Sequence, residues 1–313
     1  MKKLKICIDN GLSFKQGFEE FLESCKARNL REGTLIHYKD SYKMLMKFID
    51  EEINVKDITH ATVDNFVKNY KNNSNANSQT IYTYTRDLKT ILYFFMRMEY
   101  MPIFKITLPK VDKKVIETYT DAELKILLKK PDLKKCTFVE YRDWTIINFL
   151  LSTGVRLNSM INVKIRDLDF DNEVVHINVT KNRKPLIIPL NITIQKILKE
   201  YLKIRQYKDS NDYLFCTAYG KQLCKKTING SLIAYNKKRG IIKTGIHRYR
   251  HTFAKKYITS GGNPVFLQKI LGHSSLLITQ NYLNILVSDL KKEMDNFNIL
   301  TEFMQESIKL NKK

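Results

Sequence analysis

The feature that most constrains the fold is a break in the helical pattern of the sequence between residues 102 and 120. Apolar residues recur every three to four positions on both sides, but Pro102 and Pro109 cannot continue a helix. The intervening KVDKKVIET has the charged composition of an exposed segment, and 313 residues exceed the usual length of a single-core domain. We therefore expect a helical domain over 11–102, a linker over 103–118 and a second domain over 119–313.

The residues before the break predict four amphipathic helices. Phe14, Phe18 and Phe21 follow Ser13 at helical spacing, and similar stripes recur further along this part of the chain. The polar run NNSNANS contains one short apolar side chain and predicts a loop. The helices are expected over about 13–29, from Thr34 to about Ile49, over 62–70 and over 79–100.

The residues after the break predict a mostly α-helical domain with one small β-sheet. Thr120 followed by Glu123 has the spacing of a capping box, which marks a helix start. EVVHINVT and PLIIPL, joined by KNRK, form a β-hairpin pattern over roughly 173–189. Further helices are expected at 140–152, 156–162, 191–206, 225–238, 246–259, 263–271, 275–284 and 286–308.

The charge of the chain indicates a polyanionic partner. It carries 54 basic and 32 acidic side chains, a net charge of +22, of which +17 falls after residue 110. A basic ribosome-associated protein or a well-solvated surface would show the same excess. No apolar run is long enough to span a membrane, so we expect a cytoplasmic, nucleoid-associated protein. The five cysteines lack C-x-x-C spacing and indicate reduced thiols, not a zinc site.

Several polar residues of the second domain each have an ordinary structural interpretation when taken alone. An arginine at a helix start is commonly a surface residue, and a lysine in a turn is commonly solvated. His247 and His251 are four residues apart and could bind zinc, but no H-E-x-x-H glutamate or nearby cysteine supports a metal. The residues in question are Arg156 in STGVR, Lys181 in the hairpin turn, His247 and Arg250 in GIHRYRHTFA, His273 in LGHSS, and Tyr282.

Together these residues fit one reaction, the attack of an oxygen nucleophile on a phosphodiester. Two guanidiniums can bind the non-bridging oxygens without a metal ion. A phenol has a pKa near ~10, so Tyr282 needs a cationic environment and a base such as His247 to become a nucleophile. The leaving oxygen needs a proton, which Lys181 on a turn can supply.

The strings TGVR, the Lys181 turn before IPL, HRYRHTFA, LGHSS and TQNY, in this order, resemble the tyrosine recombinase (phage integrase) family. The first helical unit resembles that family's core-binding, SAM-like domain. The resemblance implies a phosphate clamp of Arg156 and Arg250, Lys181 as general acid, and Tyr282 as nucleophile. It makes His247 a general base or proton relay, His273 a hydrogen-bond donor to the phosphate and His251 a structural residue. Lys181 is preferred to Arg183 and Lys184 because its distance to Pro189 fits the family pattern.

The resemblance also implies partners. It predicts a Xer-like or mobile-element integrase that acts as a homo-tetramer on double-stranded DNA with a specific recombination site. Accessory DNA-bending or directionality proteins are possible partners, and no cofactor, metal or ATP is required. Only about ten residues precede Ser13, so we expect no arm-binding domain. The apolar stripe from Ile285 to Leu300 predicts a C-terminal helix that packs on a neighbouring subunit or on its own domain.

One position departs from the family pattern. Ser159 stands where members mostly carry Glu or Asp, three residues after the first arginine. We expect its hydroxyl to accept a hydrogen bond from Arg156 or His247, unless a carboxylate such as Asp167 fills that place. Two alternatives stay open: a type IB topoisomerase-like enzyme, which uses a similar residue set, and a catalytically weakened, DNA-binding integrase relic, which Ser159 alone supports.

Overall fold

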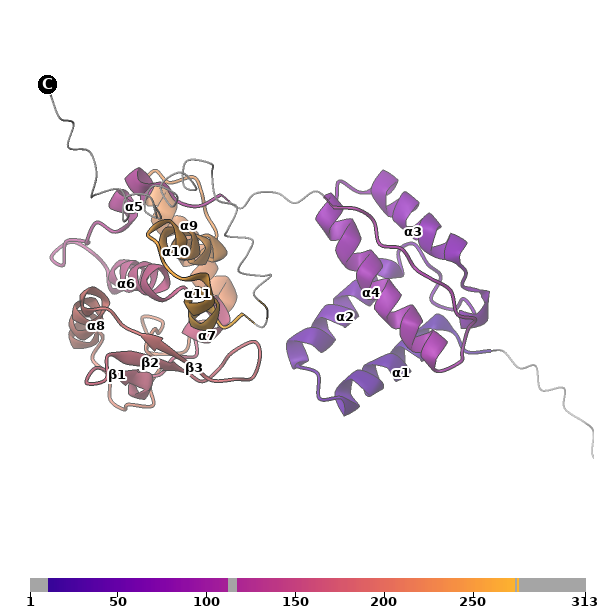
Figure 1. The fold of residues 1–313 in the computed structure, drawn as a ribbon, viewed down its shortest axis with the longest axis horizontal. Coiled ribbons are helices and arrows are strands. Elements are labelled where there is room, and N and C mark those ends of the chain that lie inside the picture. The colour runs from indigo at the N-terminus through magenta and orange to yellow at the C-terminus, as the bar shows by residue number, and fades with distance from the viewer. Residues whose placement is uncertain (1–10, 112–116, 274, 276–313) are drawn as a thin grey trace, which may run out of the picture. The chain divides into compact units, whose positions relative to one another are not determined.

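The computed structural model describes residues 11–111, 117–273 and 275 (Figure 1). The chain divides into two compact units on either side of residue 115, and each has its own hydrophobic core. Both units are built of helices, and one three-stranded sheet lies in the second. The prediction of a mostly α protein with a small β-sheet is therefore confirmed.

The first unit packs its helices around the aromatic and aliphatic stripes that the sequence pattern indicated. Phe14, Phe18 and Phe21 are buried in its core, as is Phe95 of the last helix. The side chains of Ser13 and Gln16 form a capping box that starts the first helix. Its elements are α1 (Phe14–Ala27), α2 (Glu32–Leu45), a 3-10 turn (Val55–Asp57), α3 (His60–Asn73) and α4 (Ser78–Arg97).

Several helix ends in this unit differ from the sequence expectation, including both ends of α3 and the end of α2 at Leu45. Helix α2 begins at Glu32, before Thr34, and its N-cap Arg31 makes no side-chain capping bond. The carboxylate of Glu32 lies in the first turn, where it interacts favourably with the helix dipole. Helix α4 ends at Arg97 and not at residue 100, because Glu99 adopts a left-handed backbone with φ of 61°.

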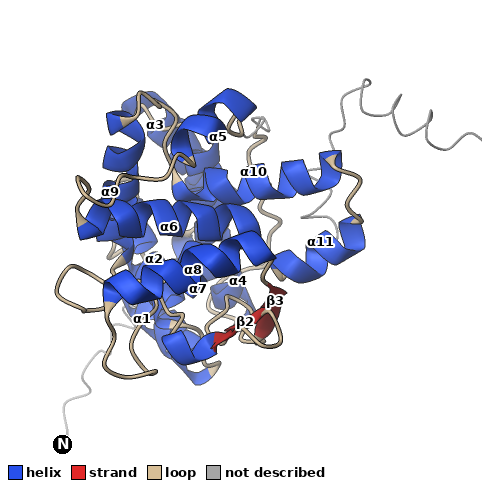
Figure 2. Cartoon of the chain, turned by 90° about the vertical axis from the view of Figure 1, so that its left-hand side faces the viewer, coloured by secondary structure: helices blue, strands red, loops and turns tan. Residues whose placement is uncertain are grey.

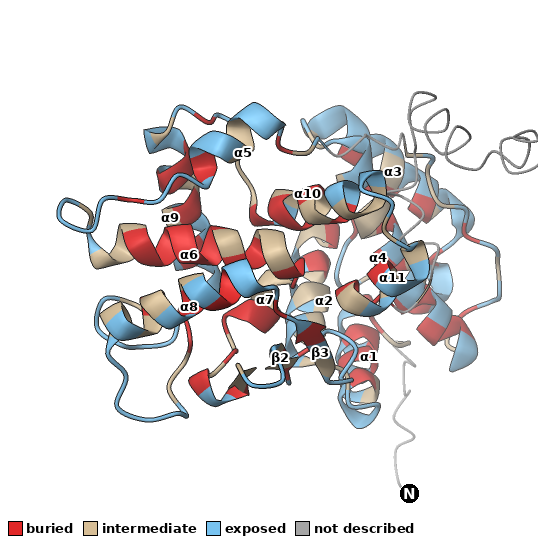
Figure 3. Cartoon of the chain, turned by 60° about the vertical axis from the view of Figure 1, so that its left-hand side comes forward, coloured by how far each residue is buried: buried red, intermediate tan, exposed pale blue. Residues whose placement is uncertain are grey.

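The second unit is organised around α6, which is buried over most of its length (Figure 3). Helices α8, α9 and α10 pack against it, and Figure 2 shows α6 and α8 running side by side. The predicted capping box of Thr120 and Glu123 starts α5. The helices are α5 (Asp121–Leu127), α6 (Phe138–Thr153), α7 (Leu157–Met160), α8 (Ile192–Arg205), α9 (Lys225–Lys238), α10 (Ile246–Thr259) and α11 (Pro264–Leu271), with a 3-10 turn at Ile165–Asp167.

The sheet is antiparallel, with the strand order β1–β2–β3. Strands β2 (Val174–Ile177) and β3 (Leu186–Pro189) form the predicted hairpin, in which Val175 lies opposite Ile188 and both are buried. Strand β1 (Leu168–Asp169) was not expected, because two residues are too few to show an alternating pattern. The helices predicted over 275–284 and 286–308 lie outside the described residues.

Candidate active site

The turn after α6 places the first arginine. Helix α6 ends at Gly154, whose left-handed φ of 61° is accessible to glycine at little cost. A Cβ atom at this position would also lie 2.4 Å from Cδ1 of Phe253 and 2.7 Å from Cδ2 of Leu271. Arg156 follows as the N-cap residue of α7, and its Nη1 donates to the carbonyls of Leu271 at 3.1 Å and Gly272 at 3.4 Å.

The second arginine comes from α10 and reaches the same place. Arg250 is buried, and its Nη1 donates to the carbonyl of Gly154 at 2.6 Å. Its Nη2 donates to the carbonyl of Leu271 at 2.9 Å. The main-chain oxygen of Leu271 therefore accepts hydrogen bonds from both Arg156 and Arg250, which fixes the two guanidiniums side by side.

The end of α11 supplies most of the oxygens that hold the arginines. Leu271 is the last residue of α11, and Gly272 caps it with a left-handed φ of 59°. The carbonyls at a helix C-terminus carry partial negative charge and stabilise cations by about 0.3–1 kcal/mol at exposed sites. The partners of the two guanidiniums among the described residues include these main-chain oxygens and, as described next, a neutral imidazole.

His273 lies directly after this helix cap and contacts Arg250. Its Nε2 is 2.8 Å from Nη2 of Arg250, and because a guanidinium can only donate, Nε2 is the acceptor. Burial, followed by the charges of Arg250 and Arg156, lowers the pKa of His273 to about 4. The ring is therefore neutral at pH 7, with its proton on Nδ1.

Two further histidines lie on the first turns of α10. His247 is exposed, and partial desolvation and then the charges of Arg250 and Arg156 lower its pKa. The pKa of His251 is also lowered, by desolvation first and then by His247 and the neighbouring arginines. A neutral His247 beside two fixed cations is able to accept a proton, as a general base must.

The turn between β2 and β3 carries Lys181, which is exposed. Its neighbour Asn182 donates from Nδ2 to the carbonyl of Gly272 at 3.3 Å, so the turn is attached to the same helix cap that holds Arg156. Sequence reasoning missed Asn182, because a single asparagine in a turn carries no motif. The LG pair before His273 does mark a helix C-terminus, but it does not show which donors its carbonyls receive.

The structure does not show the expected hydrogen bond of Ser159. This residue is buried in α7, and among the described residues its hydroxyl has no hydrogen-bond partner. Asp167 does not take its place, because its carboxylate accepts from the Lys164 amide at 2.8 Å and from Nδ2 of Asn178 at 2.9 Å. The expectation that Ser159 bonds to Arg156 or His247 is therefore not met among the described residues, where carbonyl oxygens accept from both arginines.

Tyr282, the predicted nucleophile, lies outside the described residues, as does the C-terminal segment expected to reach a neighbouring subunit. Over residues 11–111 and 117–273, no group of three or more His, Cys, Asp or Glu side chains is arranged to hold a metal ion. In the same part of the chain, no helix has the length and apolar character needed to cross a membrane.

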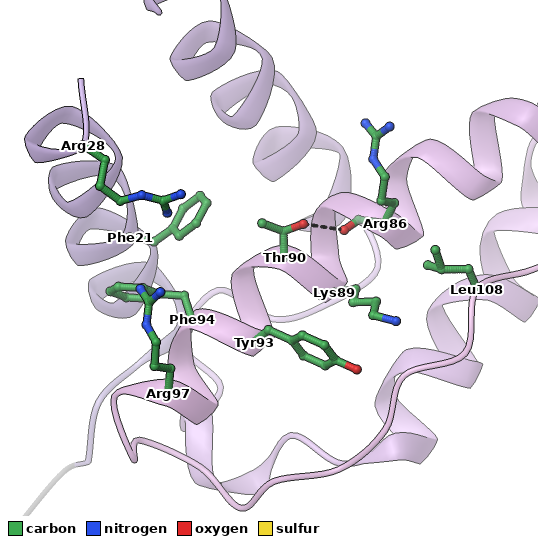
Figure 4. Close-up of a pocket in the computed structure, with 9 residues that line it drawn as sticks. All are labelled: Phe21, Arg28, Arg86, Lys89, Thr90, Tyr93, Phe94, Arg97 and Leu108. Carbon is green, nitrogen blue, oxygen red and sulfur yellow. Dashed lines mark hydrogen bonds between the residues drawn. The ribbon is translucent and has the colours of Figure 1, made fainter. Parts of the chain in front are cut away.

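The first unit contains a separate basic pocket between α1 and α4 (Figure 4). Arg97 lies over the ring of Phe94, with its guanidinium carbon 5.4 Å from the ring centre. Lys89 donates to the carbonyl of Ile106 at 2.7 Å. No carboxylate lines the pocket, so its charge and its aromatic rings suit a phosphate-bearing ligand. The lining residues are Phe21, Arg28, Arg86, Lys89, Thr90, Tyr93, Phe94, Arg97 and Leu108.

Comparison with known proteins identifies the family of both units. The model of the phage integrase family matches residues 118–288, and that of the phage integrase SAM-like domain matches residues 13–107. A tyrosine recombinase of Pseudothermotoga lettingae is 25% identical over 300 residues, which cover 93% of this chain and 98% of that protein. The tyrosine recombinase XerD of Staphylococcus saprophyticus is 27% identical over 291 residues, covering 89% of this chain and 97% of XerD.

A solved structure shows the same fold. The Tn1549 transposon integrase, in complex with a circular intermediate DNA, matches with a TM-score of 0.74 and 20% identity. The match covers 91% of this chain and 100% of that one. Because the phage integrase model matches more than half of the chain, the protein belongs to the phage integrase family of tyrosine recombinases.

Proposed function

We propose that the protein cuts and rejoins double-stranded DNA at a specific recombination site, through a covalent 3′-phosphotyrosine at Tyr282. The observation that carries the proposal is the convergence of Arg156 and Arg250 on the carbonyl of Leu271, at 3.1 and 2.9 Å. Two planar cations held side by side suit the two non-bridging oxygens of one phosphodiester. Because main-chain oxygens hold both guanidiniums in place, the charge that develops in the transition state meets preorganised donors.

Each remaining residue has one task in this reaction. His247, with its lowered pKa, accepts the proton of the Tyr282 phenol as the phenolic oxygen attacks phosphorus. The bond to the 5′ oxygen breaks, and the ammonium of Lys181 gives that oxygen a proton. His273 holds Arg250 through Nε2 and donates to the phosphate through its ring N–H. The arginine clamp makes a metal ion unnecessary, and the phosphotyrosine retains the energy of the broken phosphodiester, so rejoining requires no ATP.

Binding draws on both units and on several copies of the chain. The catalytic part of the chain carries most of the net charge, and the pocket of α1 and α4 adds cationic side chains for the DNA backbone. The Tn1549 transposon integrase was solved with DNA, which supports the same partner here. We include in the proposal a homo-tetramer assembled on the DNA, with accessory DNA-bending or directionality proteins as further partners.

A nicked duplex that traps the covalent intermediate tests the proposal. Tyr282→Phe is expected to bind this DNA like the wild type but to form no covalent adduct. The adduct of the wild type should carry a 3′ phosphate and leave a free 5′ hydroxyl. Tyr219→Phe, which changes a tyrosine that is 90% exposed on the second unit, serves as the matched control and should give the wild-type yield. An undiminished adduct in Tyr282→Phe would overturn the assignment.

A further inference from the structure

We propose that Asn182 is a positioning residue for Lys181, because its amide ties the β2–β3 turn to the helix cap that holds the arginines. The inference rests on the proposed function, in which Lys181 protonates the leaving 5′ oxygen. It adds a residue whose side chain neither touches the phosphate nor takes part in proton transfer.

The argument starts from the carbonyl of Gly272, which two donors share. Nη1 of Arg156 lies 3.4 Å from this oxygen and Nδ2 of Asn182 lies 3.3 Å from it. Strand β3 also packs on α11, and Leu186 at the start of that strand approaches Gly272. The turn is therefore fixed to the same atoms as the first arginine of the clamp, and Lys181 is the residue directly before Asn182.

The turn itself is held by local bonds that fix its shape. Oγ1 of Thr180 donates to the carbonyl of Lys184 at 2.6 Å, and Arg183 adopts a left-handed backbone with φ of 59°. This bond and this backbone angle involve only residues of the turn itself. The hydrogen bond of Asn182 to Gly272, in contrast, joins the tip of the turn to the end of α11, where the arginines are held.

Positioning of this kind matters for one bond of the reaction. A general acid must lie within hydrogen-bonding distance of the leaving oxygen when the P–O5′ bond breaks. General acid catalysis typically raises the reaction rate by about 10²–10⁴-fold. Without the Asn182 hydrogen bond the turn can move, and the Lys181 ammonium then samples other positions. Part of the rate increase from general acid catalysis is lost. The two arginines keep the carbonyls of Leu271 and Gly154 as partners, so the clamp is retained.

A change of leaving group separates this role from a general structural one. In a substrate with sulfur in place of the scissile 5′ oxygen, a thiolate leaves without a proton, since thiols have a pKa near about 8.5. Asn182→Ala should slow single-turnover cleavage of ordinary DNA by about 10- to 100-fold. It should cleave the sulfur substrate within about twofold of the wild type. Asn172→Ala, the same change in the β1–β2 turn, should affect neither rate.

Lys181→Ala in the same assay keeps the inference and the proposed function distinguishable. Recovery of Lys181→Ala on the sulfur substrate establishes Lys181 as the general acid, independently of Asn182. The inference is then overturned if Asn182→Ala loses the same factor on both substrates, or loses nothing on either. If the sulfur substrate fails to restore Lys181→Ala, the acid assignment falls, and the inference falls with it.

Discussion

The turn at Gly154 can be tested by adding one methyl group. Gly154→Ala places a Cβ atom 2.4 Å from Cδ1 of Phe253 and 2.7 Å from Cδ2 of Leu271. The left-handed backbone, with φ of 61°, costs a side-chain-bearing residue about 1–2 kcal/mol, and overpacking costs about 1–3 kcal/mol more. We therefore expect a loss of about 2–5 kcal/mol in the free energy of unfolding of the second unit.

Gly272→Ala is the matched comparison. Its φ of 59° gives the same backbone penalty, but its Cβ would lie 3.5 Å from Cδ2 of Leu186, an ordinary contact. Only the backbone term, about 1–2 kcal/mol, applies there. The difference between the two variants therefore measures how tightly α6, α10 and α11 close around the turn that precedes Arg156.

The fluorescence of Trp144 provides the assay. This is the only tryptophan of the chain, and it is buried in α6, so its emission reports the second unit alone. Urea titrations should show a larger fall in the transition midpoint for Gly154→Ala than for Gly272→Ala. Phe253→Leu, which removes the nearer ring contact, should restore part of the loss in the double variant. Equal losses in the two glycine variants, with no coupling to Phe253, would refute the packing argument.

Two further predictions concern the site. The pKa of His273 is about 4 in the folded protein, so as the pH falls below about 6.5 the unfolded chain binds this proton first. The free energy of unfolding should therefore decrease from pH 6.5 towards pH 4. Above that range this group should not affect it. His273→Gln should make this decrease shallower in urea titrations, and an unchanged profile would contradict the assignment. Ser159→Ala should cleave DNA within about twofold of the wild type, because the hydroxyl has no hydrogen-bond partner among the described residues. A loss of tenfold or more in single-turnover rate would show that the hydroxyl acts in the site.

The sequence predicted long elements better than short ones. Helices α9 and α10, each of 14 residues, begin and end at the predicted residues. Helix α7 spans Leu157–Met160, shorter than the predicted 156–162, because a single turn presents too few apolar positions to define its ends. Strand β1 was not predicted, because its two residues are likewise too few to show a pattern.

The site was predictable in its side chains but not in what holds them. Arg156, Arg250 and His273 fall in recognisable strings, and the structure brings them together. Their shared acceptor, the carbonyl of Leu271, leaves no trace in the sequence because every residue has such an oxygen. Ser159 was expected, from its position alone, to accept a hydrogen bond from Arg156 or His247, whereas the end of α11 supplies an acceptor that both arginines share.

The use of main-chain oxygens to hold the two arginines has a consequence for how this enzyme can vary. A carboxylate partner is lost by a single nucleotide change, whereas a carbonyl survives every substitution that leaves the backbone path intact. The arginine contacts should instead be most sensitive to substitution of Gly154 and Gly272. The left-handed conformations of these two glycines direct their carbonyl oxygens towards the arginines.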